Sequence, residues 1–365
     1  MEYVQERVTT LHDFGNTAPS APVERTTVLV PLTGRDYDTP AAARTFRALA
    51  TLSPARVLVS LRAEPTRVGA IVNWLNGFDL STTVLWCTAP GVERRLADAG
   101  FDGVAGKGRD AWLGLGLAAA AETEYVVVHD ADAATYDGST VSRLLFPLAR
   151  GRAFVKGYYA RVEDEKLYGR LCRLFYVPLV KTLDAAHSAP VLSYLDAFRY
   201  PLAGEFAVTG ALARRLRVPR DWGLEVGVLG DAFDIAGFAG SAQVDLGMHK
   251  HDHRSISGPG GLDEMAGNVG STLFRLLEER GIEPDYKTLP RRYQQTADRL
   301  VEQYAADAAF NGLTYDPAGE REQITAYAAS IAPSTRDTRL PAWRDIELEP
   351  DEIAALSAAA IDETR

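Results

Sequence analysis

Short apolar stretches alternate with amphipathic ones through the first 150 residues of the chain. The apolar stretches are rich in β-branched residues and predict strands at residues 26–32, 56–61, 82–87 and 124–128. The stretches between and after them predict helices at residues 40–52, 65–76, 90–99 and 106–122, with Thr39 as an N-cap and Pro40 in the first helical position. This alternation predicts an α/β fold around a largely parallel sheet, in which ligands bind beyond the carboxyl ends of the strands.

The rhythm changes after residue 150. Residues 153–160 and 242–247 predict strands, and three stretches between them predict helices: 163–183 (bent near Pro178), 201–217 (after a turn) and 222–238. From there the chain is mostly amphipathic helix, at residues 262–281, 289–310, 320–331 and 350–364. We predict four segments: an N-terminal extension (1–25), an α/β half (26–150), a second half that completes this core (151–260) and a C-terminal helical region (261–365).

Composition and charge narrow the class of protein. Asp and Glu number 49 against 39 Lys and Arg, and the resulting net charge of −10 argues against broad nucleic-acid binding, although a local basic pocket remains compatible with it. No apolar run approaches the roughly 18 residues of a membrane-spanning helix, and the first 25 residues lack the apolar core of a secretion signal. We expect Cys87 and Cys172 to be buried free thiols, and the protein to be cytoplasmic.

Two aspartates follow the strand at residues 124–128, in the order His129-Asp130-Ala131-Asp132. Residues two apart in an extended chain share a face, so both carboxylates point the same way as the strand leaves the sheet. A cation between them would relieve their repulsion, and hard oxygen ligands suit Mg²⁺ or Mn²⁺ bound to a diphosphate. The alternative is that the aspartates cap the next turn and helix.

Three of the six histidines, His249, His251 and His253, alternate within residues 248–254. In an extended segment they share one side, where three imidazoles would in principle hold zinc. A second interpretation is that one of them joins the two aspartates at a shared cation while the others contact diphosphate. The third is a solvated polar loop after a strand.

The turn Gly106-Lys107-Gly108 leads into a predicted helix, where backbone N–H groups and a lysine suit a phosphate, although a plain glycine turn is equally consistent with it. Glu205 and Glu225 each lie among small and apolar residues, where a buried carboxylate needs a partner. Sugar hydroxyls are suitable partners, and a helix cap or a salt bridge is the alternative.

Lys166, Arg170 and Arg173 are spaced to share one face of the helix predicted at residues 163–183. Such a face suits a phosphate or a carboxylate of a ligand. The alternative is a basic face that only water covers.

Taken together, these segments resemble the GT-A-fold retaining glycosyltransferases that make glucosyl- or mannosyl-3-phosphoglycerate. The resemblance covers about residues 26–280 and rests on the order and spacing of several segments. These are Gly106-Lys-Gly, Val128-His-Asp-Ala-Asp132, Val155-Lys-Gly-Tyr-Tyr159, Gly169-Arg170, Pro201-Leu-Ala-Gly-Glu205, Gly223-Leu-Glu225-Val-Gly-Val-Leu229, and Gln243-Val-Asp-Leu-Gly247 followed by His251. The resemblance implies a Rossmann-like GT-A core with a mostly parallel sheet, followed here by the C-terminal helical region.

The resemblance also implies a role for individual residues. Residues 26–150 would bind a nucleotide diphosphate sugar, UDP-glucose or GDP-mannose, through Leu32, Ser60, Lys107 and Asp130. Asp132 and His251 would hold Mg²⁺ or Mn²⁺. Residues 151–260 would bind the acceptor, a small hydroxy acid such as 3-phosphoglycerate or glycerate, through Tyr158, Arg170 and Gly204, while Glu205 and Glu225 would line the catalytic region. A homodimer is expected.

Two segments depart from the pattern of this family. Gly34-Arg35 stands where the first strand usually ends in Asn-Glu near the nucleoside, which leaves the donor base open. Residues 163–168 replace a glycine-rich acceptor loop, which leaves open whether the acceptor carries a phosphate. Two other functions also remain open: a sugar-1-phosphate nucleotidyltransferase, and a non-catalytic nucleotide-sugar-binding or assembly protein.

Overall fold

The computed structural model describes residues 4–15, 17–121, 123–250, 261–334 and 336–364. The strands of its main sheet are β1 (Thr9–Leu11), β2 (Thr26–Thr33), β3 (Arg56–Arg62), β4 (Thr82–Trp86), β5 (Tyr125–Val128), β6 (Phe154–Ala160), β9 (Phe206–Thr209) and β11 (Ser241–Met248). Short antiparallel pairs are β7 (Val162–Glu163) with β8 (Lys166–Leu167), and β10 (Val218–Pro219) with β12 (Arg339–Leu340).

Helices follow or connect these strands. Those of the first two predicted halves are η1 (Val23–Arg25), α1 (Pro40–Leu52), α2 (Pro65–Leu75), α3 (Pro90–Asp98), α4 (Lys107–Ala120), α5 (Ser139–Leu148), the π-helix η2 (Leu171–Tyr176), α6 (Val177–His187), α7 (Pro190–Asp196), α8 (Gly210–Ala213) and α9 (Leu224–Ile235). Those of the C-terminal helical region are α10 (Leu262–Glu278), α11 (Leu289–Phe310), α12 (Pro317–Ala328), η3 (Trp343–Asp345) and α13 (Pro350–Asp362).

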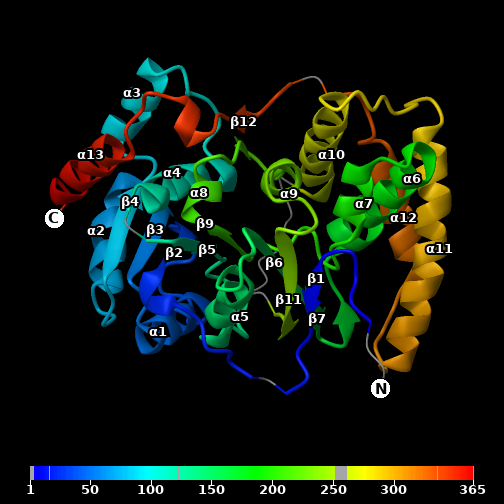
Figure 1. Cartoon of the computed structure of the whole chain (residues 1–365), viewed down its shortest axis with the longest axis horizontal. Coiled ribbons are helices and arrows are strands. Elements are labelled where there is room, and N and C mark those ends of the chain that lie inside the picture. The colour runs from blue at the N-terminus through cyan, green and yellow to red at the C-terminus, as the bar shows by residue number, and fades with distance from the viewer. Residues whose placement is uncertain (1–3, 16, 122, 251–260, 335, 365) are drawn as a thin grey trace.

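The main sheet has eight strands in the order β1-β11-β6-β9-β5-β2-β3-β4, with helices packed around it (Figure 1). Among these described strands, β9 alone runs antiparallel to its neighbours, β5 and β6, and the other pairs are parallel. The predicted α/β fold with a mostly parallel sheet is therefore confirmed. The carboxyl ends of β2, β3, β5 and β6 lie along one edge of the sheet, where a ligand is expected.

Local signals account for the first half of the chain. Thr39 caps α1 as predicted, because its side-chain oxygen accepts a hydrogen bond from the amide of Ala42 at 3.3 Å. Pro40, Pro65 and Pro90 each occupy the first position of a helix, where the missing N–H costs nothing. Strands β2 and β3 are almost fully buried, as their apolar composition predicts, whereas the edge strand β4 is buried only at Leu85 and Trp86.

The helix predicted over residues 163–183 is wrong in its first part. Val162 to Leu167 form the hairpin β7–β8, in which Asp164 and Glu165 have positive φ angles of 46° and 57°, as a tight two-residue hairpin turn requires. The helical backbone begins only with η2. The hairpin is held by contacts distant in sequence, since the amide of Thr314 donates to the carbonyl of Glu165 at 2.7 Å. Consequently Lys166 does not share a helix face with Arg170 and Arg173.

Other elements also differ from the prediction. Residues 206–209 form the strand β9 rather than part of a helix, because they fill the gap between β5 and β6 in the sheet. Residues 9–11, in the predicted N-terminal extension, form the edge strand β1 beside β11. Helix α5 was not predicted from the sequence. The proposed division at residues 25, 150 and 260 stays a prediction, and strands from the first three segments share one sheet.

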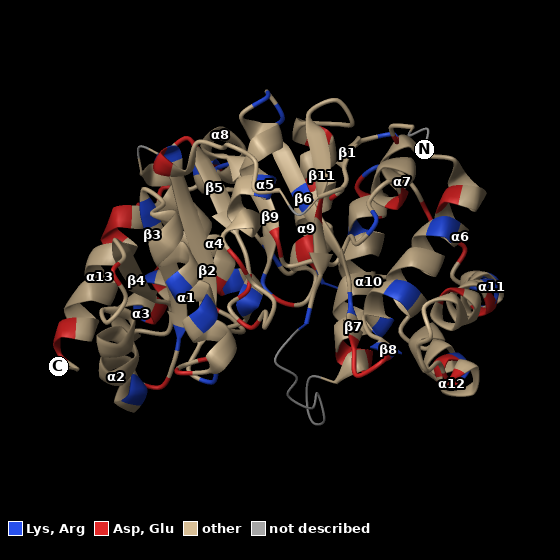
Figure 2. Ribbon diagram, turned by 90° about the horizontal axis from the view of Figure 1, so that it is seen from below, with Lys and Arg blue, Asp and Glu red and all other residues tan. Residues whose placement is uncertain are grey.

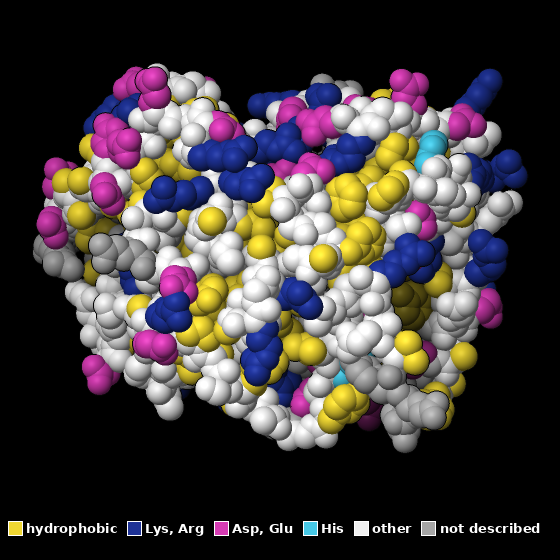
Figure 3. Space-filling view, viewed as in Figure 1, with side chains coloured by type: hydrophobic (Ala, Val, Ile, Leu, Met, Phe, Trp, Pro, Cys, Tyr) yellow, Lys and Arg dark blue, Asp and Glu magenta, His cyan; other side chains and the backbone are white. Residues whose placement is uncertain are grey.

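The C-terminal helical region lies at both ends of the molecule. Helices α10, α11 and α12 pack beside α6 and α9 at one end, whereas α13 crosses to the other end and packs on α3 and β4 (Figure 1). The connection is anchored on α4, where the ring of Trp343 stacks on that of Trp112 at 4.3 Å and its N–H donates to the Trp112 carbonyl. Figure 3 shows Lys and Arg side chains interleaved with Asp and Glu between β12 and α10, consistent with the ion pairs of Glu279 with Arg217 and Arg339.

Within the described residues, none of the helices is both long enough and apolar enough to cross a bilayer. Cys87 and Cys172 are free and buried, as predicted. Burial raises the pKa of the Cys172 thiol to about 12, which disfavours the reactive thiolate form.

Candidate active site

The start of α4 sits tightly against the segment at β10, and two glycines make this possible. A Cβ atom on Gly106 would lie 2.6 Å from the carbonyl oxygen of Arg220, and one on Gly108 would overlap the carbonyl oxygen of Pro219. Both distances are too short for any side chain. The glycines of the Gly106-Lys107-Gly108 turn therefore serve close packing, and Lys107 between them is the first residue of the helix.

Lys107 connects three elements through its ammonium group. Its Nζ lies 2.8 Å from the carboxylate of Asp130, just after β5, and 3.5 Å from Oε1 of Glu225, in the first turn of α9. Burial alone would lower the pKa of Lys107, but Asp130 and Glu225 outweigh it, so the pKa is raised and the lysine stays charged.

Gly204 and Glu205 lie directly beside this ion pair, just before β9. A Cβ on Gly204 would lie 3.1 Å from Nζ of Lys107 and would overlap a carboxylate oxygen of Asp130. Glu205 is 2% exposed, and its Oε1 lies 3.8 Å from Nε2 of His249. Five residues that we predicted for the site thus come together from distant parts of the chain, and we call them the Lys107 cluster: Lys107, Asp130, Gly204, Glu205 and Glu225.

Lys156 on β6 is a further charged residue of this region to which the sequence analysis assigned no role. It is 1% exposed, and its Nζ donates a hydrogen bond to the carbonyl oxygen of Ala203, beside Gly204. Burial lowers the pKa of Lys156 to about 8, although Glu225 and Glu205 favour its charged form. The signal in the sequence is a lysine inside an apolar strand, in a chain where arginine supplies most of the cations.

Asp132 is half-buried in the loop after β5, and His251 lies outside the described residues. The residue before His251 is nevertheless placed: the amide of Ala134 donates to the carbonyl of Lys250 at 2.8 Å, and the amide of Lys250 donates to Oγ1 of Thr135 at 3.2 Å. The loop that carries Asp132 is therefore hydrogen-bonded to the segment that leads directly to His251, the predicted histidine ligand. Among the described residues, no group of three or more His, Cys, Asp or Glu side chains is arranged to hold a metal ion.

His129, the first residue of the acidic motif, has a structural role. It is fully buried; its Nδ1 lies 3.1 Å from the carbonyl oxygen of Asp130 and its Nε2 lies 3.0 Å from the hydroxyl of Tyr136. Burial lowers the pKa of His129, which favours a neutral ring. The residue therefore holds the loop that presents Asp130 and Asp132.

Three rings in contact connect the Lys107 cluster to Arg170. His249, beside Glu205, stacks on Tyr159 with 4.1 Å between ring centroids, and the ring of Tyr200 packs against Tyr159 in a tilted arrangement at 4.8 Å. The Tyr200 hydroxyl lies so close to Gly169 that a Cβ atom on Gly169 would overlap it. Arg170 follows Gly169, so the predicted acceptor residue lies at the far end of this row of rings.

The remaining predicted residues are less closely associated with the cluster. Leu32 and Ser60 are buried at the ends of β2 and β3, and the Ser60 side chain faces Gly114 of α4, so only their backbones are available to a donor nucleotide. The hydroxyl of Tyr158 lies 2.9 Å from Nδ1 of His12, which associates it with the N-terminal segment. Their roles stay predictions.

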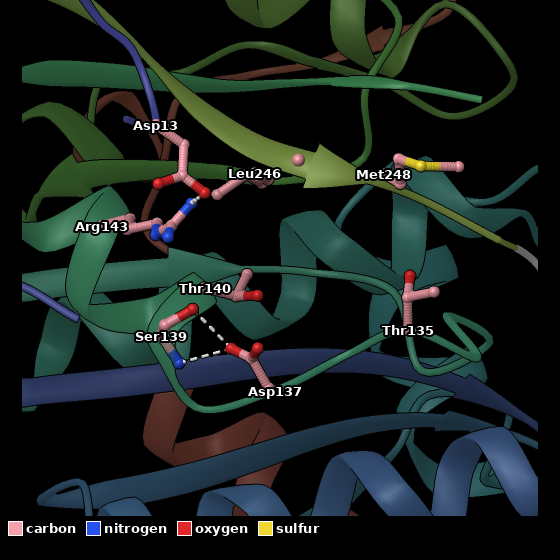
Figure 4. Close-up of a pocket in the computed structure, with 9 residues that line it drawn as sticks. Asp13, Thr135, Asp137, Ser139, Thr140, Arg143, Leu246 and Met248 are labelled. Carbon is pink, nitrogen blue, oxygen red and sulfur yellow. Dashed lines mark hydrogen bonds and ion pairs between the residues drawn. The ribbon is translucent and has the colours of Figure 1, made fainter. Parts of the chain in front are cut away.

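A polar cavity of about 240 Å³ lies elsewhere, between the end of β11 and the start of α5 (Figure 4). Its walls include Asp13 and Arg143, which form an ion pair, and Asp137, which accepts from the amide of Ser139 at 2.8 Å. The described residues that line it include none of those predicted for the site.

Replacing Gly204 by alanine tests the geometry of the Lys107 cluster. The new methyl group would displace the Asp130 carboxylate from Lys107, and we expect kcat/KM to fall about 10²-fold, as for other misplacements of about 1 Å. Gly267→Ala is the matched control, because nothing lies within 4 Å of a Cβ at that position of α10. If the steady-state kinetics of Gly204→Ala were unchanged, catalysis would not depend on the position of the Asp130 carboxylate, and the Lys107 cluster would not be the active site.

Comparisons with known proteins agree with this geometry. The chain is 31% identical over 399 aligned positions to glucosyl-3-phosphoglycerate synthase of Methanococcoides burtonii, covering 100% of the chain and 98% of that protein. It is 34% identical over 327 positions to the enzyme of the same name from Persephonella marina, covering 85% of the chain and 81% of that protein. No protein-family model matches the chain.

Solved structures show the same fold. Glucosyl-3-phosphoglycerate synthase of Mycobacterium tuberculosis, in complex with Mn²⁺, UDP and glucosyl-3-phosphoglycerate, superposes with a TM-score of 0.55 at 22% identity, covering 75% of this chain and 89% of that one. The same protein in complex with Mg²⁺ and UDP gives a TM-score of 0.55 at 24% identity, covering 76% and 88%. Because relatives above 30% identity match it over most or all of its length, the chain belongs to the glucosyl-3-phosphoglycerate synthase family of glycosyltransferases.

Proposed function

We propose that this protein transfers a glucosyl group from UDP-glucose to the free hydroxyl of 3-phosphoglycerate, with retention of configuration at the sugar. The observation that carries the proposal is the Lys107 cluster, a partly buried ammonium group among three carboxylates beside the carboxyl end of β5. The names of the relatives support the glucosyl group and the acceptor, and a Mycobacterium tuberculosis neighbour in complex with Mn²⁺, UDP-glucose and phosphoglyceric acid supports the donor.

The residues of the cluster divide the work by charge. Lys107, at the start of α4, balances the charge of the donor diphosphate, helped by the helix N-terminus. Glu205 and Glu225 accept hydrogen bonds from hydroxyl groups of the sugar or the acceptor and orient them. The acceptor hydroxyl attacks the anomeric carbon from the face of the departing diphosphate; the bond from that carbon to the phosphate oxygen breaks, and the hydroxyl proton passes to the diphosphate.

Asp132 and His251 would hold Mg²⁺ or Mn²⁺. A half-buried carboxylate, and a loop hydrogen-bonded to the residue before the histidine, fit a hard divalent cation, which favours oxygen ligands. The ion supplies neutralisation of the negative charge that develops on the departing diphosphate. The neighbours in complex with Mn²⁺ or Mg²⁺ support this choice of metal.

Two lesser predictions belong with this function. The first is a cytoplasmic location. The two cysteines are free and buried, and the reducing conditions of the cytoplasm would keep them unpaired even when they become exposed. The expected homodimer is a proposal that sedimentation of the purified protein would test.

The direct test is nucleotide release. The protein is mixed with UDP-glucose or GDP-mannose and Mg²⁺ or Mn²⁺, with and without 3-phosphoglycerate or glycerate. We expect UDP release that requires UDP-glucose, 3-phosphoglycerate and the metal, and that stops when the metal is chelated. Release without an acceptor would contradict the proposal, and so would pyrophosphate formed from a nucleoside triphosphate and a sugar phosphate, the nucleotidyltransferase reaction. If neither assay detected a product, the remaining interpretation would be a non-catalytic nucleotide-sugar-binding or assembly protein.

A further inference from the structure

One buried carboxylate of the C-terminal helical region reaches the predicted acceptor residue. Glu320, in the first turn of α12, is 3% exposed. Its Oε1 accepts from Nε of Arg170 at 3.0 Å, and its Oε2 accepts from Nη1 of Arg173 at 2.9 Å and from the hydroxyl of Tyr315 at 3.1 Å. The contact joins residues 150 positions apart in the chain.

The two arginines differ in what else they bind. The Arg173 side chain is 9% exposed, and it also donates to the carbonyl oxygens of Tyr168 and Leu167. It is therefore committed to the fold. The Arg170 side chain is 45% exposed, and within the described part of the chain its two terminal nitrogens have no hydrogen-bond partner.

The charges of this group leave a place for an anion. Arg170 and Arg173 carry two positive charges and Glu320 one negative charge, so one positive charge remains within the group. It lies on the more exposed guanidinium, that of Arg170, because Arg173 is the more deeply buried of the two. A guanidinium held at Nε presents both terminal nitrogens in one plane, which is the geometry that binds two oxygens of a phosphate or carboxylate.

The backbone around Arg170 is also specialised. Gly169 has a φ of 79°, a conformation that favours glycine, and the π-helix η2 begins directly after Arg170. Short π-helices are frequently found at functional sites. Hairpin β7–β8, which leads into this turn, lies in the same half of the molecule as α11 and α12 (Figure 2), and its Lys166 forms a β-bridge with Thr314 in the loop between these two helices. The C-terminal region thus borders the acceptor side of the site.

We propose that Glu320 is a positioning residue for the acceptor: it fixes the guanidinium of Arg170 so that the terminal nitrogens face the acceptor phosphate. The proposal rests on the proposed function, which supplies the phosphorylated acceptor. It gives the C-terminal helical region a role in substrate selection, because Glu320 of α12 positions the arginine that binds the acceptor phosphate. Without Glu320, the Arg170 side chain would sample several conformations, and binding of the acceptor would have to order it.

The test compares Glu320→Gln, which keeps the size of the side chain and removes its charge, with wild type and with Arg170→Ala. We expect Glu320→Gln to raise the KM for 3-phosphoglycerate about tenfold, the cost of ordering one long side chain, and to leave the KM for UDP-glucose within about twofold. In the Arg170→Ala background, Glu320→Gln should change the acceptor KM no further. With glycerate, which has no phosphate, the single variant should behave as wild type.

A matched control removes a comparable buried ion pair elsewhere. Asp231 in α9 is 4% exposed and pairs with Arg217 at 2.6 Å, so Asp231→Asn controls for the general cost of losing a buried charge. We expect it to leave the acceptor KM unchanged. A second variant, Arg170→Lys, keeps the Glu320–Arg173 pair and the positive charge but lacks the planar fork, and we expect it to raise the acceptor KM as Glu320→Gln does.

Several results would overturn the proposal while leaving the proposed function intact. These are an unchanged acceptor KM in Glu320→Gln or Arg170→Lys, an equal rise in both KM values, or a Glu320→Gln effect that persists in the Arg170→Ala background. Each would mean that Glu320 serves only the fold. A wild-type protein with no acceptor-dependent transfer would overturn both.

Discussion

Asp132→Ala is expected to lower metal-dependent glucosyl transfer by about 10³-fold. The carboxylate is the one protein ligand of the proposed metal site that lies among the described residues, and the metal held there would neutralise charge on the leaving diphosphate. A loss of about 10³-fold corresponds to about 4 kcal/mol of transition-state stabilisation, which is in the range of such an electrostatic contribution. Turnover at saturating UDP-glucose and 3-phosphoglycerate, measured over a range of Mg²⁺ and Mn²⁺ concentrations, checks it.

The fold should survive this change, because Asp132 is half-buried and lies in a loop after β5. Asp137→Ala is the matched control: it removes an exposed aspartate from the same loop, and its loss should cost only the hydrogen bonds from the amide and hydroxyl of Ser139, about 1 kcal/mol of stability. Its turnover should equal that of wild type. Wild-type turnover and metal dependence in Asp132→Ala itself would remove the metal-site assignment.

Lys107→Met is expected to lower kcat/KM by about 10³-fold, because it removes the cation that faces the diphosphate and keeps the length of the side chain. It also leaves Asp130, Glu205 and Glu225 without their central positive charge. Repulsion among these carboxylates should then move them apart and disturb the arrangement of the cluster. Steady-state kinetics and the affinity for UDP, each measured in the variant and in wild type, check this prediction.

Two variants separate charge from packing at this position. Lys107→Arg keeps the charge and should retain more activity than Lys107→Met. Lys181→Met removes an exposed lysine that pairs with Asp196 at 2.8 Å on the surface, and it should leave the kinetics unchanged, since exposed ion pairs contribute little. If Lys107→Met kept wild-type kcat/KM, the Lys107 cluster would not be the donor site.

Local sequence patterns predicted most of the helices and strands of the fold. The strands of the first half are short apolar runs, and prolines or caps mark the helices between them, so the elements could be predicted without knowledge of their neighbours. The failures are elements that tertiary contacts create. The hairpin β7–β8 depends on contact with Thr314, and β1 and β9 are strands of three and four residues that form because β11, β5 and β6 offer them partners.

The site follows the same division. Lys107, Asp130, Glu205 and Glu225 were predicted from motif order and from a resemblance to a family, and the structure brings them together. Lys156 had no motif of its own, and its importance appears only because β6 buries it next to the loop of Gly204 and Glu205. Glu320 lies in the first turn of α12, where nothing in the local sequence distinguishes it from a solvent-facing glutamate.

By itself, the sequence determined the α/β class and most of the helices and strands, because propensity, periodicity and capping act over a few neighbouring residues; motif order and a family resemblance pointed to the residues of the Lys107 cluster. Only the tertiary structure decided that Lys156 supports the loop beside the Lys107 cluster and that Glu320 reaches Arg170. Contacts over such separations depend on how the elements pack. Burial then determines their strength, because an ion pair withdrawn from water is screened far less than one on the surface.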